Sequence, residues 1–417
     1  MSHIAIVGAG QAGASLAAKL RALGHDGRIT MFGAEPVPPY QRPPLSKGYL
    51  LGEMDLTRLF LRPERFYREH DIALRLGAAV DAVDAAGRTV SIGGEAVPYD
   101  MLALTTGSVP RRLPEAVGGA LEGVYAVRAL ADVDAMAPEF RPGRRLLVVG
   151  GGYIGLEAAA VAAKLGLQVT LIEAAPRILQ RVAAPETADW FRRLHGAHGV
   201  DLREGVGLEQ LTGEGRVAGA RLSDGSVIEV DFAVVGIGIR PATDLAEAAG
   251  LAIEDGIRTD AYGRTSDPAI WAAGDCASFP WSGGRLRLES VGNAIDQAEA
   301  VAANMLGAGV PYEAKPWFWS DQFDAKLQIA GFGRGHDRIV TRAAGDGAVS
   351  FWYFAGPRLI AVDAMNDPRA YMIGKRLIEA GLSPDQDVLA NPATNLKDLL
   401  APTRVAEARA QVGQPRP

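Results

Sequence analysis

Hydrophobic residues along this chain form short runs that alternate with glycine-rich turns and alanine-rich segments. The runs at 4–7 and 146–149 are wholly apolar, which is typical of strands buried on both faces. Each run is followed by a glycine-rich turn, an alanine-rich stretch that predicts a helix, and a second apolar run. This order predicts an α/β fold with parallel sheets.

The same pattern occurs twice, as a weak internal repeat. The first copy has a strand at 4–7, a helix from about 14 to 23 and a strand at 29–32, followed by Glu35. The second copy has a strand at 146–149, a helix ending near 165 and a strand at 169–172, followed directly by Glu173. Two Rossmann units are therefore predicted.

The turns of both copies have the spacing of a dinucleotide-binding fingerprint. Glycines permit a tight turn and a close approach of backbone N–H groups to a pyrophosphate, and the acid accepts hydrogen bonds from a ribose. Two alternatives stay open: one copy only packs, or Glu35 is an ordinary solvated acid. The predicted binding residues are Gly8, Gly10, Ala12, Gly13 and Glu35 in the first copy, and Gly150, Gly152, Tyr153, Ile154 and Glu173 in the second.

Two further strands mark where the chain enters and leaves the second unit. The run at 102–108 ends in small residues and the run at 232–241 ends in glycines and proline, which indicates crossover points, although each is also compatible with an ordinary strand and turn. The second unit is thus predicted to be an insertion in the first domain. These ends add the candidates Thr106 and Gly107 on the first site, and Gly236, Ile237 and Gly238 on the second.

A buried strand after the insertion ends in Gly274 and Asp275. An aspartate in this place is suited to accept hydrogen bonds from a polyhydroxyl chain. FAD has such a chain in its ribityl group, and NAD does not. We therefore assign FAD to the first unit and NAD to the inserted one.

Composition narrows the classes of partner. The chain has 417 residues, which suggests two or three domains, and its 22% charged residues with a net charge of −6 argue against nucleic acid. No apolar run reaches the roughly 18 residues of a membrane span, and no charged leader precedes the first strand, so we expect a cytoplasmic protein. The single Cys276 allows no internal disulfide and no cysteine-held cluster, and we expect it to pack as a small hydrophobe.

Over nearly its whole length the chain resembles the FAD-dependent NADH:ferredoxin reductases of oxygenase systems, the group of putidaredoxin reductase, rubredoxin reductase and dioxygenase reductases. The resemblance rests on the turn from Gly150 to Glu157 and on five further segments. These are Pro39-Tyr40-Gln41-Arg42-Pro43-Pro44-Leu45-Ser46-Lys47, Glu173-Ala174-Ala175-Pro176-Arg177, Ala273-Gly274-Asp275-Cys276, Arg287-Leu288-Glu289-Ser290-Val291 and Pro316-Trp317-Phe318-Trp319-Ser320-Asp321-Gln322.

The resemblance implies roles for several residues. Arg42 and Lys47 would lie beside FAD, with Lys47 near the reactive edge of the flavin and paired with Glu157, and the pair would orient rather than transfer protons. Ser290 and Val291 would open a helix that points at the flavin, although Gly292 stands where the family usually has a larger amide. Trp319 would lie near the flavin. The alternatives are a surface lysine for Lys47, a first-turn acid for Glu157 and core packing for Trp319.

The C-terminal part is predicted to be an α+β domain. Strands are expected at 328–332, 338–341, 348–354 and 358–363, a helix at 368–379, and a frayed tail from Pro402. The predicted division is 1–109 with 242–316 for FAD, 110–241 for NAD and 317–417 for the C-terminal domain. The fold class is thus two Rossmann-like domains of the glutathione-reductase type, one inserted in the other, plus this domain.

With no cluster or redox thiol of its own, the chain must pass electrons from FAD to an external acceptor. A ferredoxin or rubredoxin that feeds a cytochrome P450 or a ring-hydroxylating dioxygenase is the leading hypothesis. A small acceptor such as oxygen or a quinone, and a redox sensor or interaction protein, are the alternatives. Candidate docking residues, which are equally compatible with solvated surface, are Arg62, Arg65, Lys375 and Arg376.

NADH is the expected donor, because Glu173 can accept a hydrogen bond from a ribose 2′-hydroxyl but repels a 2′-phosphate. Such a bond gives about a tenfold to hundredfold preference. The nearby Arg177 acts in the other direction. We expect a monomer or a weak homodimer.

Overall fold

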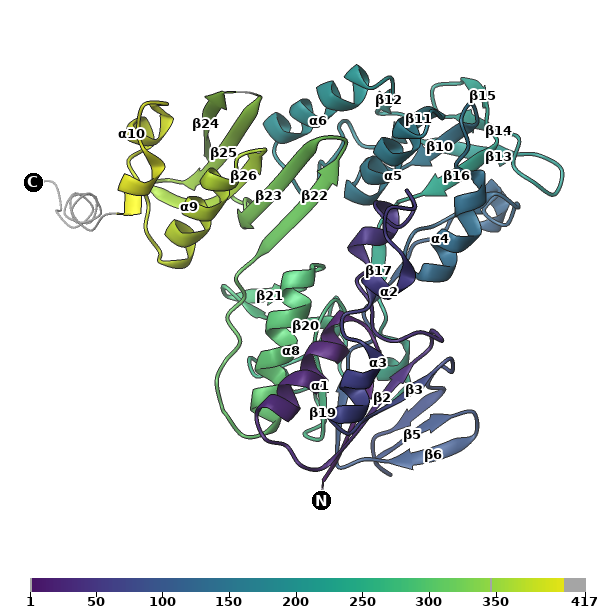
Figure 1. The fold of residues 1–417 in the computed structure, drawn as a ribbon, viewed down its shortest axis with the longest axis vertical. Helices are drawn as coiled ribbons and strands as arrows, with labels where there is room; N and C mark the ends of the chain where they lie inside the picture. Colours follow the sequence, from purple (N-terminus) through teal and green to yellow (C-terminus); the bar gives the residue numbers. More distant parts are fainter. Residues whose placement is uncertain (1, 346, 401–417) are drawn as a thin grey trace, which may run out of the picture. The chain divides into compact units, whose positions relative to one another are not determined.

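The computed structural model describes residues 2–345 and 347–400. The chain forms two compact units (Figure 1). The first contains the residues up to Arg111, the short segment Arg128–Leu130 and Gly238–Ala314; the second contains Arg112–Val127, Ala131–Ile237 and the residues from Lys315 on. The tail from Pro402, for which fraying is predicted, lies outside the described residues.

The first unit is built on a parallel five-stranded sheet with the order β19-β7-β1-β2-β3. Side chains of the central strand alternate between two cores: Ile4 and Ile6 pack under helices α1 and α8, while Ala5 and Val7 pack against a small antiparallel sheet. The helices α1 and α8 lie side by side (Figure 1). The elements are β1 (His3–Val7), α1 (Gln11–Ala22), β2 (Arg28–Gly33), β3 (Ile72–Leu76), β7 (Met101–Leu104), β19 (Ile270–Ala272) and α8 (Val291–Met305).

Smaller elements complete this unit. One three-stranded antiparallel sheet is formed by β4, β5 and β6, and another group of three strands by β18, β20 and β21. Their bounds and those of the short helices are η1 (Pro43–Ser46), α2 (Leu56–Leu59), α3 (Glu64–Glu69), β4 (Ala82–Asp84), β5 (Thr89–Ile92), β6 (Glu95–Pro98), α7 (Asp244–Ala248), β18 (Ile257–Arg258), β20 (Ala277–Trp281) and β21 (Gly284–Leu286).

The chain leaves and re-enters the first unit through two paired strands. β8 (Ser108–Pro110) and β17 (Ile239–Pro241) run antiparallel, and the N–H of Arg111 donates to the carbonyl of Gly238 at 2.9 Å. Because the exit and the return are hydrogen-bonded to each other, the intervening residues form an insertion, as the sequence predicted.

The second unit contains a parallel sheet with the order β12-β11-β10-β16-β9. Its central strand β10 has the same neighbours as β1 has in the first unit: the strand after the glycine turn on one side and a late strand on the other. The elements are η2 (Glu115–Val117), β9 (Val124–Tyr125), α4 (Leu130–Met136), η3 (Ala137–Glu139), β10 (Arg145–Val149), α5 (Tyr153–Lys164), β11 (Gln168–Glu173), α6 (Pro185–Ala197), β12 (Asp201–Glu204), β13 (Leu208–Thr212), β14 (Gly219–Leu222), β15 (Val227–Glu229) and β16 (Phe232–Val235).

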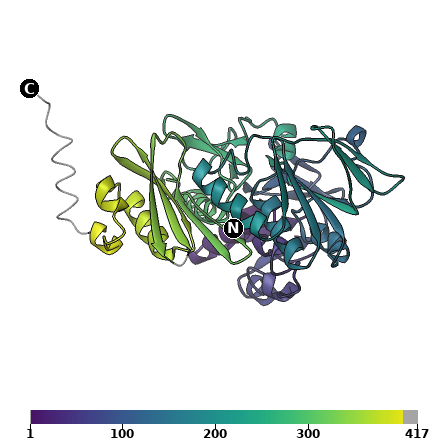
Figure 2. The ribbon, with the colours of Figure 1, turned by 90° about the horizontal axis from the view of Figure 1, so that it is seen from above.

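An antiparallel sheet follows in the same unit, with the order β22-β23-β26-β25-β24. Helix α9 lies on one side of it and helix α6 on the other (Figure 2). Val362 and Trp352 face Gly374 of α9, whereas the neighbouring Asp363 and Tyr353 face Thr187 of α6. The elements are β22 (Trp317–Gln322), β23 (Ala325–Gly331), β24 (Arg338–Gly345), β25 (Ala348–Ala355), β26 (Arg358–Met365), α9 (Pro368–Glu379), α10 (Gln386–Ala390) and η4 (Leu396–Leu400).

The element predictions are largely confirmed. Helix α9 has the predicted bounds, and the four C-terminal strands are present with ends shifted by a few residues. In the C-terminal sheet the strand β22 was not predicted, because its aromatic residues were treated only as a motif. The three-domain division stays a prediction.

Candidate functional site

The first glycine turn is shaped for close backbone approach. Gly8 has φ +118°, and a Cβ added there would lie 2.2 Å from the carbonyl oxygen of Thr105; one added to Gly13 would lie 2.0 Å from the carbonyl oxygen of Gly8. A Cβ on Gly10, by contrast, would meet nothing within 4 Å. Gly10 caps α1 without a side-chain hydrogen bond, so no cap side chain occupies the first N–H groups of this helix.

Ala12 lies one step further along α1, on the side of the Gly274–Asp275 loop. A Cβ on Gly274 would lie 2.9 Å from the methyl group of Ala12, so both small residues are needed for helix and loop to approach each other. The structure thus brings the predicted Gly8, Gly10 and Ala12 together with Asp275, which lies in a distant part of the chain.

Glu35 lies just past β2, and two side chains hold it. The hydroxyl of Tyr40 donates to one carboxylate oxygen at 2.6 Å, and the guanidinium of Arg42 donates to the other at 2.6 Å. Tyr40 also accepts from the backbone N–H of Leu130 at 2.9 Å, and Arg42 donates to the carbonyl of Arg128 at 2.7 Å. Glu35 is therefore an organised acid rather than a freely solvated one.

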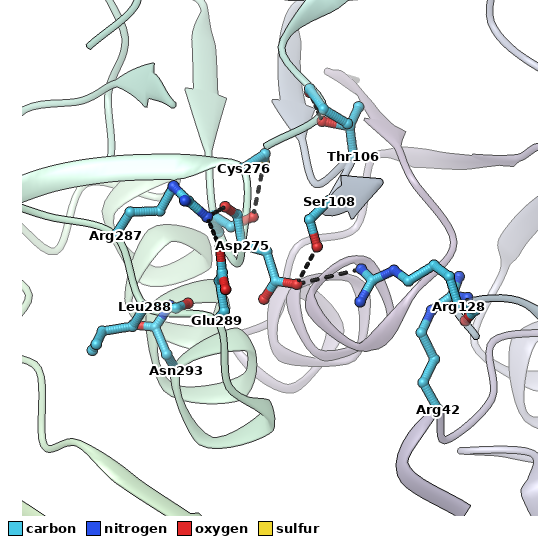
Figure 3. A network of polar contacts seen from close by, with 12 residues as sticks. Arg42, Thr106, Ser108, Arg128, Asp275, Cys276, Arg287, Leu288, Glu289 and Asn293 are labelled. Carbon is cyan, nitrogen blue, oxygen red and sulfur yellow. Dashed lines mark hydrogen bonds and ion pairs between the residues drawn. The ribbon is translucent and has the colours of Figure 1, made fainter. Parts of the chain in front are cut away.

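Asp275 is the centre of a polar network (Figure 3). Its Oδ2 accepts from Ser108 Oγ at 2.8 Å and from Arg128 Nη2 at 3.3 Å. Arg287 donates to the backbone carbonyl of Asp275 at 3.3 Å and also to Glu289. Burial lowers the pKa of Arg128, and Asp275 opposes this by stabilising the charged guanidinium.

The other predicted residues of the first unit adjoin this network. Thr106 donates to the carbonyl of Ala242 at 2.6 Å, and a Cβ on Gly107 would lie 3.1 Å from Arg128 Nη2. Ser290 caps α8 by accepting from the N–H of Asn293 at 3.2 Å, and Val291 is the first residue of that helix. The helix predicted to open at this point is thus confirmed, while its contact with the flavin stays a prediction.

Cys276 lies in the core beside this loop. It is fully buried, and its thiol contacts the carbonyls of Leu104 and Ala273. Burial raises the pKa of this thiol, which disfavours the reactive thiolate. Packing as a small hydrophobe is confirmed.

The second glycine turn repeats the geometry of the first. A Cβ on Gly150 would lie 2.5 Å from the carbonyl oxygen of Gly236, and one on Gly155 would lie 2.1 Å from the carbonyl oxygen of Gly150. A Cβ on Gly152 would meet nothing within 4 Å, and Gly152 caps α5 without a side-chain bond. Beside it Ile154 is 44% exposed, whereas the ring of Tyr153 packs on Phe318 with centroids 4.6 Å apart.

Glu173 is tied to this turn through its own carboxylate. One oxygen accepts from the N–H of Gly151 and the other from the N–H of Ala175, both at 2.7 Å. Arg177 donates to the backbone carbonyls of Ile178, Gln180 and Ala183 at 3.5, 3.4 and 2.9 Å. Of the remaining candidates, Gly236 lies against Gly150, Ile237 packs into the core of the second unit, and Gly238 belongs to the first unit.

Glu157 and Trp319 both belong to the second unit, and Lys47 belongs to the first. Glu157 is 4% exposed and accepts a hydrogen bond from Ser320 at 2.7 Å. Trp319 stacks on Trp317 with centroids 5.4 Å apart, and Lys375 Nζ lies 5.6 Å from the ring of Trp317. Lys47 closes the turn η1. The pairing of Lys47 with Glu157 stays a prediction.

The sequence interpretation missed four residues that organise these sites. Arg128 and Ser108 bind Asp275, Tyr40 binds Glu35, and Ser320 binds Glu157. Tyr40 and Ser320 belong to the segments that carry the family resemblance, so the sequence contained a signal for both of them. Nothing in the local sequence singles out Arg128, because it comes from a segment of three residues between two parts of the other unit.

Both turns fit a dinucleotide. Each has an uncapped helix start, glycines that a Cβ would block, open space at the middle glycine and an acid at the end of the next strand. Only the first has Asp275, in the turn that follows the late strand β19, where it can accept hydrogen bonds from a polyhydroxyl chain. Among the described residues no group of three or more histidine, cysteine or acidic side chains is suited to hold a metal ion. No described helix is long and apolar enough to cross a membrane.

Comparisons with known proteins agree with this geometry. Residues 2–298 match the family model described as pyridine nucleotide-disulphide oxidoreductase, and residues 317–400 match one described as reductase C-terminal. The chain is 43% identical over 405 residues to the 5,5′-dehydrodivanillate O-demethylase ferredoxin reductase subunit of a Sphingobium species, covering 95% of this chain and 98% of that one. It is 38% identical to putidaredoxin reductase of Pseudomonas putida, covering 96% and 97%.

Solved structures give the same result. The reductase in the covalent putidaredoxin reductase–putidaredoxin complex superposes with a TM-score of 0.92 at 37% identity, covering 98% of this chain and 99% of that one. The ferredoxin reductase of a cytochrome P450 system from Rhodopseudomonas palustris also gives 0.92, at 38% identity, covering 96% and 100%. The fold class is confirmed, and FAD and NAD(P)H are the cofactors of this family. The chain belongs to the pyridine nucleotide-disulphide oxidoreductases, within the group of FAD-dependent ferredoxin reductases.

Proposed function

We propose that this protein takes reducing equivalents from NADH onto FAD and passes them singly to a ferredoxin or rubredoxin that feeds a cytochrome P450 or a ring-hydroxylating dioxygenase. The observation that carries the proposal is the pair of uncapped glycine turns in separate units, only one of which has the Asp275 network. Two dinucleotides of different chemistry can thus be held at once.

FAD, when bound, accepts two electrons together and releases them one at a time. The residues of the first unit bind and orient it: the start of α1 for the pyrophosphate, Glu35 for the ribose, and Asp275 for the ribityl hydroxyls. The N-terminus of α8 at Val291 presents the positive end of a helix dipole, which stabilises negative charge nearby. Arg42 and Arg128 add positive charge to the same network.

NADH is the proposed donor. Glu173 lies at the end of β11, and backbone N–H groups fix both of its oxygens, so its charge stays where a ribose would lie. Arg177, the residue that would favour a 2′-phosphate, is bound to three backbone carbonyls of its own loop. These contacts strengthen the preference for NADH that the sequence predicted.

A one-electron carrier is the proposed acceptor. The one thiol of the chain is buried in the core, so an internal disulfide relay is not part of the scheme. Relatives at about 40% identity over nearly the full length are named rhodocoxin reductase in Rhodococcus erythropolis and putidaredoxin reductase in Pseudomonas putida. The half-buried stack of Trp317 and Trp319 provides an aromatic surface in the C-terminal sheet.

The experiment is a steady-state assay of NADH oxidation by the flavin-loaded protein, with and without an added two-iron ferredoxin or rubredoxin. Turnover that requires the carrier and greatly exceeds oxygen consumption is expected. Turnover that is equally fast with oxygen or a quinone alone would favour the small-acceptor alternative. A slow reaction with every acceptor would favour the redox sensor.

The docking surface of the carrier is a further part of the proposal. Arg62 and Arg65 belong to the first unit, and Lys375 and Arg376 to the second. Lys375 is held between Glu379, at 3.7 Å, and the ring of Trp317, which fixes its charge beside the aromatic stack. Charge reversal at Arg376 should weaken ferredoxin reduction most at low salt, and an unchanged salt dependence would remove it from the surface. We propose a monomer or weak homodimer, which sedimentation velocity tests.

A further inference from the structure

A chain of buried hydrogen bonds runs through the second unit to Glu157. His195 Nε2 on α6 lies 2.8 Å from Gln322 Oε1, Gln322 Nε2 lies 3.1 Å from Ser320 Oγ, and Ser320 Oγ lies 2.7 Å from Glu157 Oε1. The four side chains are 0, 1, 0 and 4% exposed in that order. They come from two helices and one strand, α6, β22 and α5, so the chain joins the C-terminal sheet to the NAD-binding layer.

Chemistry fixes the direction of every hydrogen in this chain. Ser320 donates its single hydroxyl proton to the carboxyl oxygen of Glu157. The Ser320 oxygen then accepts from the amide nitrogen of Gln322, which turns the amide oxygen toward His195. His195 must therefore carry its proton on Nε2, and Nδ1 is the bare nitrogen.

Two observations on His195 agree with this direction. Its Nδ1 is buried and has no hydrogen-bond partner among the described residues, as a bare nitrogen without a donor would. Burial lowers the pKa of His195 to about 4, so the ring is neutral near neutral pH. All three donors thus point the same way, toward the carboxylate of Glu157.

Burying four polar side chains at this position carries a desolvation cost, which suggests that they are there for their function and not for stability. Apolar side chains of similar size would fill the same joint without desolvation and without an orphaned nitrogen. The hydrogen-bond chain ends at Glu157, four residues after Tyr153, in the first turns of the helix that opens at the NAD-binding glycines. On the opposite face of β22 the alternate residues Trp317 and Trp319 form the aromatic stack.

We propose that Ser320, Gln322 and His195 are positioning residues that hold the carboxylate of Glu157 for the reduction of FAD by NADH. The proposal rests on the proposed function, because it assigns the chain to the first step of that reaction. Ser320 makes the direct bond, Gln322 fixes the Ser320 hydroxyl, and His195 fixes the amide of Gln322. One face of strand β22 then contacts Glu157 through Ser320, and the other face carries Trp317 and Trp319.

The first experiment is anaerobic stopped-flow reduction of the flavin-loaded Ser320→Ala variant over a range of NADH concentrations. We expect the limiting rate to fall about tenfold, as for loss of a hydrogen bond to a charged group, while the dissociation constant for NADH stays within about twofold. Gln322→Leu leaves the direct bond in place and should lower the limiting rate by a smaller factor.

Ser350→Ala is the matched control. Ser350 is also fully buried in the C-terminal sheet and accepts one hydrogen bond, from Trp352 Nε1 at 3.0 Å. If Ser320 is only structural, both serine variants should lose similar thermal stability and neither should change the limiting rate. An unchanged rate in Ser320→Ala would overturn the proposal.

A second readout is independent of turnover. Histidine-selective ¹⁵N NMR of the whole protein reports which ring nitrogen carries the proton. The expected signal for His195 is a single Nε2–H tautomer in the wild type that becomes mixed in Ser320→Ala, because Gln322 is then free to turn. An Nδ1–H tautomer in the wild type would overturn the direction of the chain.

The two proposals fail in different ways. If NADH does not reduce the wild-type flavin, the proposed function fails and the role of the chain falls with it. If the wild type is reduced fast and Ser320→Ala is equally fast, the proposed function stands and only the positioning role is lost.

Discussion

The two glycine turns share one backbone geometry but are supported in opposite ways. In the first unit the acid after the second strand, Glu35, is held by the side chains of Tyr40 and Arg42. In the second unit Glu173 is held by backbone N–H groups of its own turn and loop. The same fingerprint is thus embedded in a side-chain network in one unit and in bare backbone in the other.

This difference suits the two ligands that the sites are proposed to hold. A cofactor that stays bound through every turnover gains from many ordered contacts contributed by distant segments, such as Arg128 and Asp275. A cofactor that enters and leaves in each turnover gains from a site with few such contacts and an open side, where Ile154 is exposed. Four substitutions test this contrast, and they follow in order of decreasing expected effect.

Asp275→Ala should release FAD. The change leaves the guanidinium of Arg128 buried without the carboxylate of Asp275. Removing one partner of a buried ion pair destabilises a structure by about 3–5 kcal/mol, and the effect is smaller here because both side chains retain some exposure. We expect the FAD dissociation constant, measured by flavin fluorescence, to rise by about a hundredfold or more. NAD⁺ binding to the second unit should be unchanged, and a variant that retained FAD at wild-type affinity would contradict the assignment.

Asp363→Asn should change the pH dependence of stability. Asp275 has a cationic partner, whereas among the described residues Asp363 in the second unit accepts from two hydroxyls, those of Thr187, at 2.7 Å, and Tyr353. Burial raises the pKa of Asp363 to about 6. The stabilisation from its proton is therefore complete below about pH 4 and is lost as the pH rises through about 6.

Urea unfolding at pH 4.5 and pH 8 measures this effect. The wild type should lose about 2 kcal/mol more than Asp363→Asn between these pH values, because the variant has no proton to release there. Equal losses in the two proteins would show that the carboxyl keeps its ordinary pKa.

Glu173→Ala tests the backbone-supported site. Loss of a charged hydrogen bond to the ribose and of the repulsion of a 2′-phosphate should lower the ratio of kcat/KM for NADH over NADPH by about tenfold to hundredfold. FAD content should not change. Glu35→Ala is the matched variant of the other unit, and it should affect FAD content and not this ratio.

Tyr40→Phe is the smallest of the four changes. It removes the hydroxyl that binds Glu35, Arg42 and the N–H of Leu130, and we expect the FAD dissociation constant to rise about tenfold. Tyr67→Phe and Tyr99→Phe are controls, because these buried hydroxyls have no hydrogen-bond partner among the described residues. Equal rises of the FAD dissociation constant in all three variants would mean that the hydrogen bonds of the Tyr40 hydroxyl do not contribute to FAD binding.

The sequence predicted those parts of the molecule that depend on local chemistry. Apolar runs and glycine spacing predicted both turns, the inserted unit and the acid that ends β11, and the family resemblance implied the helix at 291. The partner of an acid is a different matter, because it depends on which distant segment the fold brings near. Arg128 is 147 residues from Asp275 along the chain, and Ser320 is 163 residues from Glu157.

The strand β22 shows a second limit. Its residues Trp317 to Gln322 are three aromatic residues followed by three polar ones, so no period-two pattern marks the strand, and the segment was interpreted only as a family motif. In the structure the pleat of the strand separates two faces, one with the tryptophan stack and one with Ser320 and Gln322. A strand without an alternating pattern does not show in the sequence which of its residues share a face, and only tertiary structure shows what each face contacts.

The central claim is that electrons enter as a pair from NADH and leave singly to a protein carrier. An anaerobic double-mixing experiment tests it most directly: NADH is added first, an oxidised two-iron ferredoxin second, and flavin absorbance is followed throughout. Fast bleaching by NADH followed by fast, ferredoxin-dependent recovery is the predicted result. Fast bleaching that ferredoxin and rubredoxin both fail to reverse, while oxygen or a quinone does, would contradict the account.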